Sequence, residues 1–205
     1  MGLCVVRSAH LKQNIYWREI KNETISDYER ARTILEKQGW KIVGAVLDGR
    51  PGVRGVFNDM PVQMCHYHQK QIINRYLTTR PKLEASIQLR KIVHYLCQTN
   101  EKQFTKKLDI WHQKWLVFLK ERTTNPETRK WSYTHKKIRS AYRSLKINLP
   151  YLFTYQKYPK LGIPRTTNSL DGYFSHLKEL VKIHRGLNRT MKLKMIDEIL
   201  AKKQP

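Results

Sequence analysis

The spacing of apolar residues divides the chain into a β-rich front and a mainly helical remainder. Residues 3–9 and 13–24 are rich in β-branched and aromatic residues around a short polar stretch, which predicts two strands of a hairpin. The next segment has helical periodicity, begins at a capping Ser26 or Asp27 and ends at Gly39. The apolar face of this predicted helix consists of Tyr28, Ala31, Ile34 and Leu35.

A short and almost entirely apolar run, residues 41–49 (KIVGAVLDG), comes next. Such a run is typical of a strand that is buried on both faces of a sheet. Residues 62–65 (VQMC) predict one more short strand, and a long helical pattern starts at His68. The order strand, strand, helix, buried strand predicts an α/β fold.

The second half of the chain has mainly helical periodicity. Apolar residues recur at helical spacing from residue 81 to about residue 119, again in residues 168–184, and in a terminal helix from residue 191. Residues 121–130 (ERTTNPETRK) predict a polar loop, the best internal boundary. The sequence contains no internal repeat and no Gly/Ser linker, so its 205 residues predict one main domain.

The charge of the chain indicates what kind of partner it binds. Lys and Arg number 40 against 16 Asp and Glu, which gives a formal net charge of +24. Such a charge attracts polyanions, of which nucleic acid is the commonest. The alternative is a generally basic, solvated surface, as ribosomal and membrane-surface proteins have. An RNA-binding or ribosome-associated protein fits the charge equally well.

The basic residues are concentrated between Thr128 and Leu170, where no acidic residue occurs. We expect them to contact the nucleic-acid backbone. They are Arg129, Lys130, Lys136, Lys137, Arg139, Arg143, Lys146, Lys157, Lys160 and Arg165. Aromatic residues are interleaved with them, and these either stack on bases or pack in the core. They are Tyr133, Tyr142, Tyr151, Phe153, Tyr155 and Tyr158.

The cysteines and the absence of long apolar runs indicate in which cellular compartment the protein is expected. The three cysteines, Cys4, Cys65 and Cys97, are odd in number and widely spaced, which argues for a reducing cytosol and against a disulfide framework. No apolar run approaches the roughly 20 residues that a membrane helix needs. A soluble, cytoplasmic protein with no membrane partner is therefore expected.

Two aspartates are candidates for metal chemistry. Asp48 ends the apolar run, and a residue there emerges at the edge of a sheet, where open α/β folds bind ligands. Asp171 is the first carboxylate after the basic region. If the two converge, their oxygens suit Mg²⁺ held against a phosphodiester. The alternatives are that Asp48 forms a turn and that Asn168 or Asp171 caps the following helix.

Cys65 and His68 form a C-x-x-H pair. A structural zinc site needs four ligands, and His94 with Cys97 is the obvious second pair. The alternative is that Cys97 packs in a helix core and that His94 is incidental.

Three stretches taken together resemble the mutator-type bacterial insertion-sequence transposases. They are residues 46–57 (VLDGRPGVRGVF), 61–81 (PVQMCHYHQKQIINRYLTTRP) and 166–178 (TTNSLDGYFSHLK). The family's pattern has a strand ending in Asp-Gly, a C-x-x-H shortly afterwards, an all-helical insertion, and a Thr-Thr-Asn-x-x-acid that opens the last catalytic helix. The resemblance covers about residues 3–200. It implies an RNase H-like fold with a DDE metal site.

The resemblance implies a role for single residues. Asp48 corresponds to the second acid of the catalytic triad and Asp171 to the third, and both would bind a divalent cation, Mg²⁺ or Mn²⁺. Cys65 and His68 correspond to the accessory C-x-x-H close to the metal. The third acid is most often Glu in the family, and Asp171 is shorter by one methylene.

The front of the chain departs from the family pattern. The family's first aspartate lies in a strand before the hairpin, and the opening segment MGLCVVRSA contains no acid. The nearest acids, Glu19, Glu23 and Asp27, fall in the second predicted strand or at the helix cap. We therefore expect an amino-terminally truncated transposase that shows little or no strand cleavage.

The resemblance thus implies an α/β, RNase H-like core whose first strand is missing, with a large all-helical insertion. Residues 1–74 would be partial core, 75–150 the insertion and 151–205 the carboxyl-terminal catalytic-core helices. The implied function is a DDE transposase fragment in DNA transposition, acting by metal-dependent phosphodiester cleavage and strand transfer. The alternative is a catalytically inactive DNA-binding remnant or a regulator of a full-length transposase.

The expected partners are DNA, as element ends and target, and a second protein chain. That chain would be another copy of this one or a full-length transposase. Arg50 and Arg54 are expected to contact phosphates or to balance the charge of Asp48. The full set of expected DNA-binding residues is Arg50, Arg54, Lys136, Lys137, Arg139, Arg143 and Arg165.

Overall fold

The structure, a computed structural model, describes residues 2–50 and 52–201, and it begins with an antiparallel hairpin. Strand β1 (Gly2–Ser8) pairs with β2 (Gln13–Ile20), and Val5 lies opposite Trp17. Because side chains alternate across a strand, Leu3, Val5 and Trp17 share one face and Cys4 lies on the other. The predicted hairpin is confirmed.

Helix α1 (Ile25–Lys37) packs on the hairpin and buries Ala31 and Leu35. Its N-cap is Thr24, two or three positions before the predicted cap. Asp27 occupies the third helical position instead, and its carboxylate accepts a hydrogen bond from the Thr24 amide at 2.9 Å. This reciprocal arrangement is a capping box, which satisfies amide groups at the exposed helix start.

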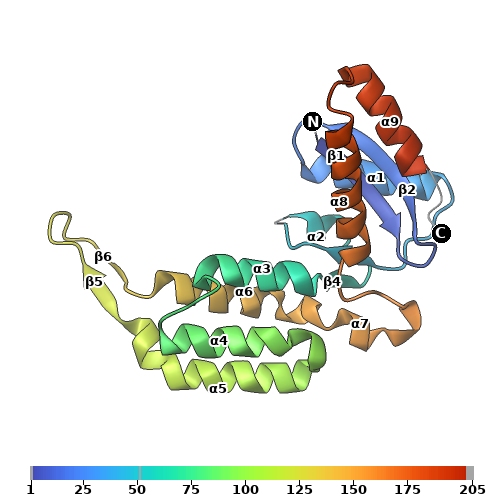
Figure 1. Ribbon diagram of the computed structural model, residues 1–205. Helices are drawn as coiled ribbons and strands as arrows, with labels where there is room; N and C mark the ends of the chain where they lie inside the picture. Colours follow the sequence, from blue (N-terminus) through green and yellow to red (C-terminus); the bar gives the residue numbers. More distant parts are fainter. Residues whose placement is uncertain (1, 51, 202–205) are drawn as a thin grey trace.

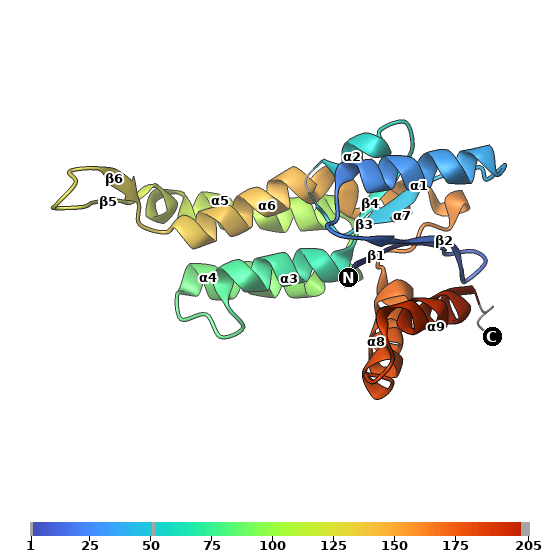
Figure 2. The same cartoon turned by 90° about the horizontal axis from the view of Figure 1, so that it is seen from above.

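Two helices cover the opposite face of the hairpin, α8 (Asn168–Ile183) and α9 (Arg189–Ala201). Figure 2 shows the hairpin between α1 on one side and these two helices on the other. The Trp17 indole donates to Asp197 Oδ1 at 3.1 Å, and the Tyr173 hydroxyl donates to the Ile199 carbonyl at 2.7 Å. The core of this lobe is formed by Tyr173, Leu177, Ile196 and Leu200, packed against Leu3, Val5 and Trp17.

A separate parallel pair consists of β3 (Ala45–Leu47) and β4 (Val62–Met64), with the short helix α2 (Val53–Val56) between them. Strand β4 is fully buried, whereas β3 is only half-buried, unlike the strand buried on both faces that the apolar run predicts. Among the described residues the two pairs share no ladder, so the β structure consists of two-stranded sheets. About 59% of the chain is helical. A mixed α/β fold is confirmed.

The helical part is an elongated bundle of α3 (His66–Leu77), α4 (Glu84–His94), α5 (Glu101–Lys120) and α6 (Lys136–Leu152). A single 3₁₀ turn, η1 (Tyr95–Gln98), connects α4 to α5. The packing of the bundle includes α3, and so begins before residue 75, where the insertion is predicted to start. Its fully buried side chains include Ile73, Leu89, Leu96, Phe104, Leu108, Leu145 and Leu152.

The predicted polar loop between α5 and α6 is a β-hairpin. Strand β5 (Arg122–Thr124) pairs with β6 (Trp131–Tyr133), and the pair projects from one end of the bundle (Figure 1). Residues 121–131 are all exposed. The local sequence is polar because neither face of this hairpin packs against a core.

A buried polar network joins β4 to the carboxyl end of α6. The Gln63 side chain donates to the Leu152 carbonyl at 2.9 Å, and the Thr154 hydroxyl donates to the Val62 carbonyl at 2.7 Å. His66 Nε2 lies 2.6 Å from the same Leu152 oxygen. Short helices α7 (Thr154–Lys157) and η2 (Pro159–Leu161) then lead the chain back to the start of α8. The network therefore fixes where α8 begins relative to β3 and β4.

Candidate functional site

Asp48 lies directly after β3, is exposed, and forms the turn that leaves the strand. Its Oδ1 accepts a hydrogen bond from the Arg50 amide at 3.0 Å. The next residue, Gly49, has φ +92°, and a Cβ there would lie 2.5 Å from Met64 Cε. Only glycine fits this backbone conformation and this close approach. The glycine of the Asp-Gly sequence therefore has a structural role in the turn. The Asp48 carboxylate stays open to solvent and is free to bind a ligand.

Thr167 brings the C-x-x-H residues and Asp171 together. Its amide donates to Cys65 Sγ at 3.3 Å, and its hydroxyl lies 3.3 Å from the same sulfur. That hydroxyl is also 3.4 Å from His68 Nδ1, and it donates to Asp171 Oδ2 at 2.9 Å. Cys65 and His68, from the start of α3, therefore meet the first turn of α8 across about a hundred residues of sequence.

An open cleft of about 780 Å³ lies beside this cluster, and it connects the cluster with Asp48. Both Asp48 and His68 line it, and His68 is the residue that the cleft and the Thr167 cluster share. The rest of the lining comes from the turn after β3 and from α3 and α6. It consists of Gly49, Arg50, Ile72, Arg75, Tyr76, Ser140, Arg143, Ser144, Ile147 and Asn148.

The cleft has a cationic wall. Arg75 and Arg143 are exposed, and within residues 2–50 and 52–201 neither has a carboxylate partner. Arg50 differs because its guanidinium lies 2.7 Å from Glu23 Oε2. Two unpaired guanidinium groups and two serine hydroxyls beside one carboxylate suit the phosphates of an anionic ligand.

The described residues fit a divalent cation only in part. Asp48 and Asp171 supply oxygen donors of the kind that Mg²⁺ and Mn²⁺ prefer. No three acidic, His or Cys side chains among these residues gather closely enough to hold a metal. Two carboxylates alone do not complete a two-cation site.

The structure does not support the alternative of a zinc site either. In the described part of the chain, no three His, Cys or acidic side chains lie close enough together to bind zinc. Cys65 is fully buried, and its sulfur is engaged by Thr167. His94 ends α4, where its carbonyl accepts a hydrogen bond from Lys70 at 2.9 Å.

Arg54, expected from the sequence to contact phosphates or to balance the charge of Asp48, faces the protein interior. Its guanidinium donates to Asn148 Oδ1 and lies 4.3 Å from the centre of the Tyr151 ring. Burial lowers the pKa of this arginine. The Asn148 amide in turn donates to Gln69 Oε1 at 2.6 Å. Arg54 therefore links α2 to the bundle.

The other predicted DNA-binding residues lie in different surroundings. Lys136 and Lys137 are exposed in the first turn of α6. Arg139 stacks on Tyr133 at 3.5 Å and donates to the Leu119 carbonyl at 2.7 Å, so it holds the base of the β5–β6 hairpin. Arg165 donates to the Cys97 carbonyl at 3.0 Å. Arg143 lines the cleft.

Most of the interleaved aromatic residues belong to the core. Phe153 is fully buried, and Tyr142, Tyr151 and Tyr155 pack against the bundle core. Tyr158 is exposed. Of the two predicted roles, stacking on bases or packing in the core, these aromatic residues mostly have the second.

Sequence reasoning missed two residues of the site, Arg75 and Thr167. Thr167 stands inside the Thr-Thr-Asn motif, and its place directly before the helix was the available clue. Arg75 lies seven residues after His68, a separation that returns to the same helix face after two turns. That spacing could have indicated that Arg75 and His68 share one cleft.

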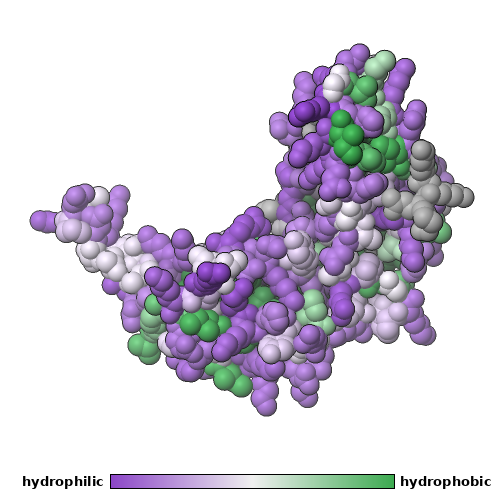
Figure 3. Space-filling view, in the orientation of Figure 1, coloured by the Kyte–Doolittle hydropathy of each residue, from purple (hydrophilic) through white to green (hydrophobic). Residues whose placement is uncertain are grey.

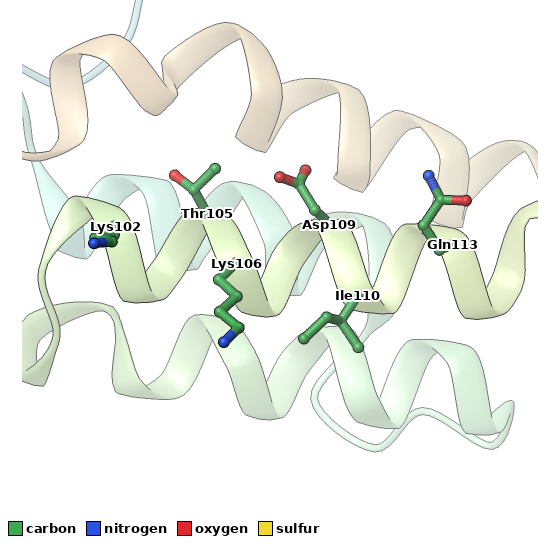
Figure 4. Close-up of a pocket in the computed structure, with 6 residues that line it drawn as sticks. All are labelled: Lys102, Thr105, Lys106, Asp109, Ile110 and Gln113. Carbon is green, nitrogen blue, oxygen red and sulfur yellow. The ribbon is translucent and has the colours of Figure 1, made fainter.

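A second hollow, of about 690 Å³, runs along the outside of α5 (Figure 4). Its one carboxylate, Asp109, lies 3.5 Å from Lys146 Nζ, and the lining has no His or Cys. It therefore offers no reactive group comparable to the cleft beside Asp48. In the described part of the chain, no helix combines the length and the apolar character needed to cross a membrane.

Comparison of the chain with protein-family models, with curated proteins and with solved structures finds no match. Its function therefore has to be argued from its own residues.

Proposed function

We propose that this chain is the catalytic-domain part of a DDE-type DNA transposase, with an RNase H-like core and a helical insertion. Asp48 and Asp171 are its acidic residues for a divalent cation, Mg²⁺ or Mn²⁺, and Cys65 and His68 are accessory to them. Such a domain acts by metal-dependent phosphodiester cleavage and strand transfer on DNA.

One observation carries this proposal: the Thr167 hydroxyl joins Cys65, His68 and Asp171 beside the cleft that Asp48 lines. These residues come from the three stretches that resemble the mutator-type transposases. Unrelated turns and caps would have no reason to converge. The order of antiparallel hairpin, helix, Asp48-bearing strand and parallel strand supports the RNase H-like core.

The cleft supports DNA as the substrate. Arg75 and Arg143 are available to phosphates on the same side as Asp48, and the net charge of +24 favours a polyanion at longer range. A cytoplasmic location is part of the proposal, because the three widely spaced cysteines argue for a reducing compartment. So is pairing with another copy of this chain or with a full-length transposase.

The second candidate is a DNA-binding regulator without catalytic activity. It is favoured by the lack of any group of three potential metal ligands among the described residues. Such a chain would occupy element ends or pair with an active transposase without cutting DNA.

The test uses the purified chain with labelled duplexes that carry the sequences flanking its coding region. Binding is measured first, and cleavage is then measured with Mg²⁺ and with Mn²⁺. Cleavage that Asp48→Asn and Asp171→Asn both abolish supports the enzyme. Binding without cleavage supports the regulator. A chain that binds no duplex at low salt contradicts both.

A further inference from the structure

The β5–β6 hairpin, residues 121–135, is an arm that contacts the bundle only at its base. Its residues 121–131 are exposed, and on the face seen in Figure 3 the arm is hydrophilic to intermediate in hydropathy. A two-stranded hairpin without a packed face is marginally stable in water. Its retention as an ordered projection therefore points to an external partner.

Local contacts nevertheless give the arm a defined shape. Asn125 organises its tip, since Asn125 Oδ1 accepts hydrogen bonds from the Glu127 amide at 2.8 Å and from the Thr128 amide at 3.1 Å. The Thr123 and Thr134 hydroxyls lie 2.7 Å apart across the strands. At the base, His135 stacks on Phe118 with ring centres 3.6 Å apart. The arm is thus anchored to α5 and α6 at one end only.

The arm carries a concentrated positive charge. Arg122, Arg129 and Lys130 lie on it, and Lys136 and Lys137 follow at the start of α6. The acidic residues nearby are Glu127 and Glu121, and Glu121 already contacts His135 at 2.8 Å. This balance suits a polyanion and disfavours a basic or neutral partner helix.

A basic track connects the arm to the cleft. Lys136, Ser140, Arg143 and Ile147 recur at helical spacing on one face of α6, and the last three line the cleft. This face of α6 extends over about 16 Å at 1.5 Å per residue. The three residues of each arm strand add roughly 10 Å more. The whole track, about 26 Å, thus covers most of one turn of B-DNA, which is about 34 Å.

The shape of the arm favours duplex over single-stranded nucleic acid. The major groove of B-DNA is about 12 Å wide and admits a two-stranded β-ribbon. Single-strand binding needs open aromatic faces on which bases stack. Trp131 is 53% exposed, but the Arg122 guanidinium lies 4.0 Å from its ring centre and covers one face.

We propose that the β5–β6 arm enters the major groove of duplex DNA and is the far anchor of a track that begins at the Asp48 cleft. Arg122, Arg129 and Lys130 contact the flanking phosphates. This inference rests on the proposed function, because it assigns the DNA of that site a path along α6.

The test measures binding of the full chain to a labelled 30-base-pair duplex over a series of salt concentrations. The arm variant combines Arg122→Ala, Arg129→Ala and Lys130→Ala. The control variant combines Lys102→Ala, Lys106→Ala and Lys107→Ala, which removes the same charge from exposed positions on α5. In Figure 1, α5 lies on the other side of the bundle from α3, which lines the cleft. Thermal melting checks that both variants remain folded.

The arm variant should bind the duplex roughly ten- to a hundredfold more weakly and lower the slope of log K against log salt by about 2 to 3. The control variant should change the slope by less than about 1. An equal loss of duplex affinity in both variants, or an unchanged salt slope in the arm variant, would contradict DNA binding by the arm. Neither result would contradict DNA binding by the cleft. Loss confined to a single-stranded probe also overturns it. A wild-type chain that binds no duplex contradicts the proposed function as well.

Discussion

Cys65 and Thr167 are 102 residues apart in the sequence, yet the Thr167 amide donates to the Cys65 sulfur at 3.3 Å. The His66 amide also donates to the Arg165 carbonyl at 3.0 Å, so two adjacent backbone segments are fixed together. These contacts place the start of α8 against the start of α3. They are the reason that Asp171 and His68 lie on either side of one hydroxyl.

Replacing Thr167 with Val should separate this cluster while keeping its volume. The sulfur, the imidazole and the carboxylate would each lose the hydroxyl, and we expect the free energy of unfolding to fall by roughly 1 to 2 kcal/mol. Urea denaturation measures it. Thr167→Ser keeps the hydroxyl and should retain most of the stability, so equal losses in the two variants would contradict the bridging role.

Gly49→Ala should destabilise the turn that carries Asp48. The position has φ +92°, and the new Cβ would lie 2.5 Å from Met64 Cε, so strain and overlap together should cost about 2 to 3 kcal/mol. Gly172→Ala is the matched control. Gly172 lies inside α8 with nothing within 4 Å of an added Cβ, and there alanine should stabilise by roughly 0.5 to 1 kcal/mol. Melting temperatures of the two variants should shift in opposite directions.

Asn148→Leu should cost more than a typical buried substitution. It removes the acceptor of the Arg54 guanidinium and the donor to Gln69 Oε1, so two partly or fully buried groups lose a partner. We expect a loss of about 2 to 4 kcal/mol in chemical denaturation. Ser144→Ala removes only the weaker Gln69 contact of 3.3 Å and should cost less than about 1 kcal/mol. Similar values for both would argue against the Arg54 network.

Stability should depend on pH through His66. Burial, the largest cause, lowers its pKa to about 4, although the bond with the Leu152 carbonyl opposes this. Its Nδ1 is buried and has no hydrogen-bond partner among residues 2–50 and 52–201. Because the folded pKa is below the unfolded value of about 6.5, the neutral form is favoured on folding. The stabilisation is complete above about pH 6.5 and falls as the pH drops towards 4, by roughly 3 kcal/mol.

The variant His66→Gln removes this titration. Its stability should be lower at pH 7 but should change less between pH 6.5 and 4, as measured by urea denaturation at each pH. An identical pH profile in both proteins would assign the dependence to other groups. Asp27 and Asp59 have lowered pKa values, from bonds with Thr24 and Arg32 respectively, so their contribution is lost at still lower pH.

The two unpaired cleft arginines should govern DNA affinity near Asp48. Arg75→Ala combined with Arg143→Ala should weaken duplex binding about tenfold or more and lower the salt slope by about 2. Arg185→Ala, at an exposed position between α8 and α9, serves as the control and should change binding little. Weakening by Arg185→Ala to the same extent would indicate binding by general charge alone.

The local elements follow from the sequence alone. Alternating and β-branched residues predicted β1 and β2, and helical spacing predicted α1 and the long helices, because each of these elements needs one apolar face at a fixed period. It also singled out Asp48, Cys65, His68 and Asp171, and it established the positive charge. The cap of α1 was displaced to Thr24, since several neighbouring polar residues can cap a helix equally well.

Which of these residues meet depends on the packing of distant elements against one another. Thr167 joins Cys65 to Asp171 through contacts across 102 residues, and no local period encodes such a pairing. Arg54 turned inward because Asn148 and Tyr151, on a distant helix, offered it partners. The polar segment after α5 became a projecting arm because no core surface reaches it. The chemistry of an arginine side chain allows it to bind phosphate, but the packing of other elements decides whether it is free to do so.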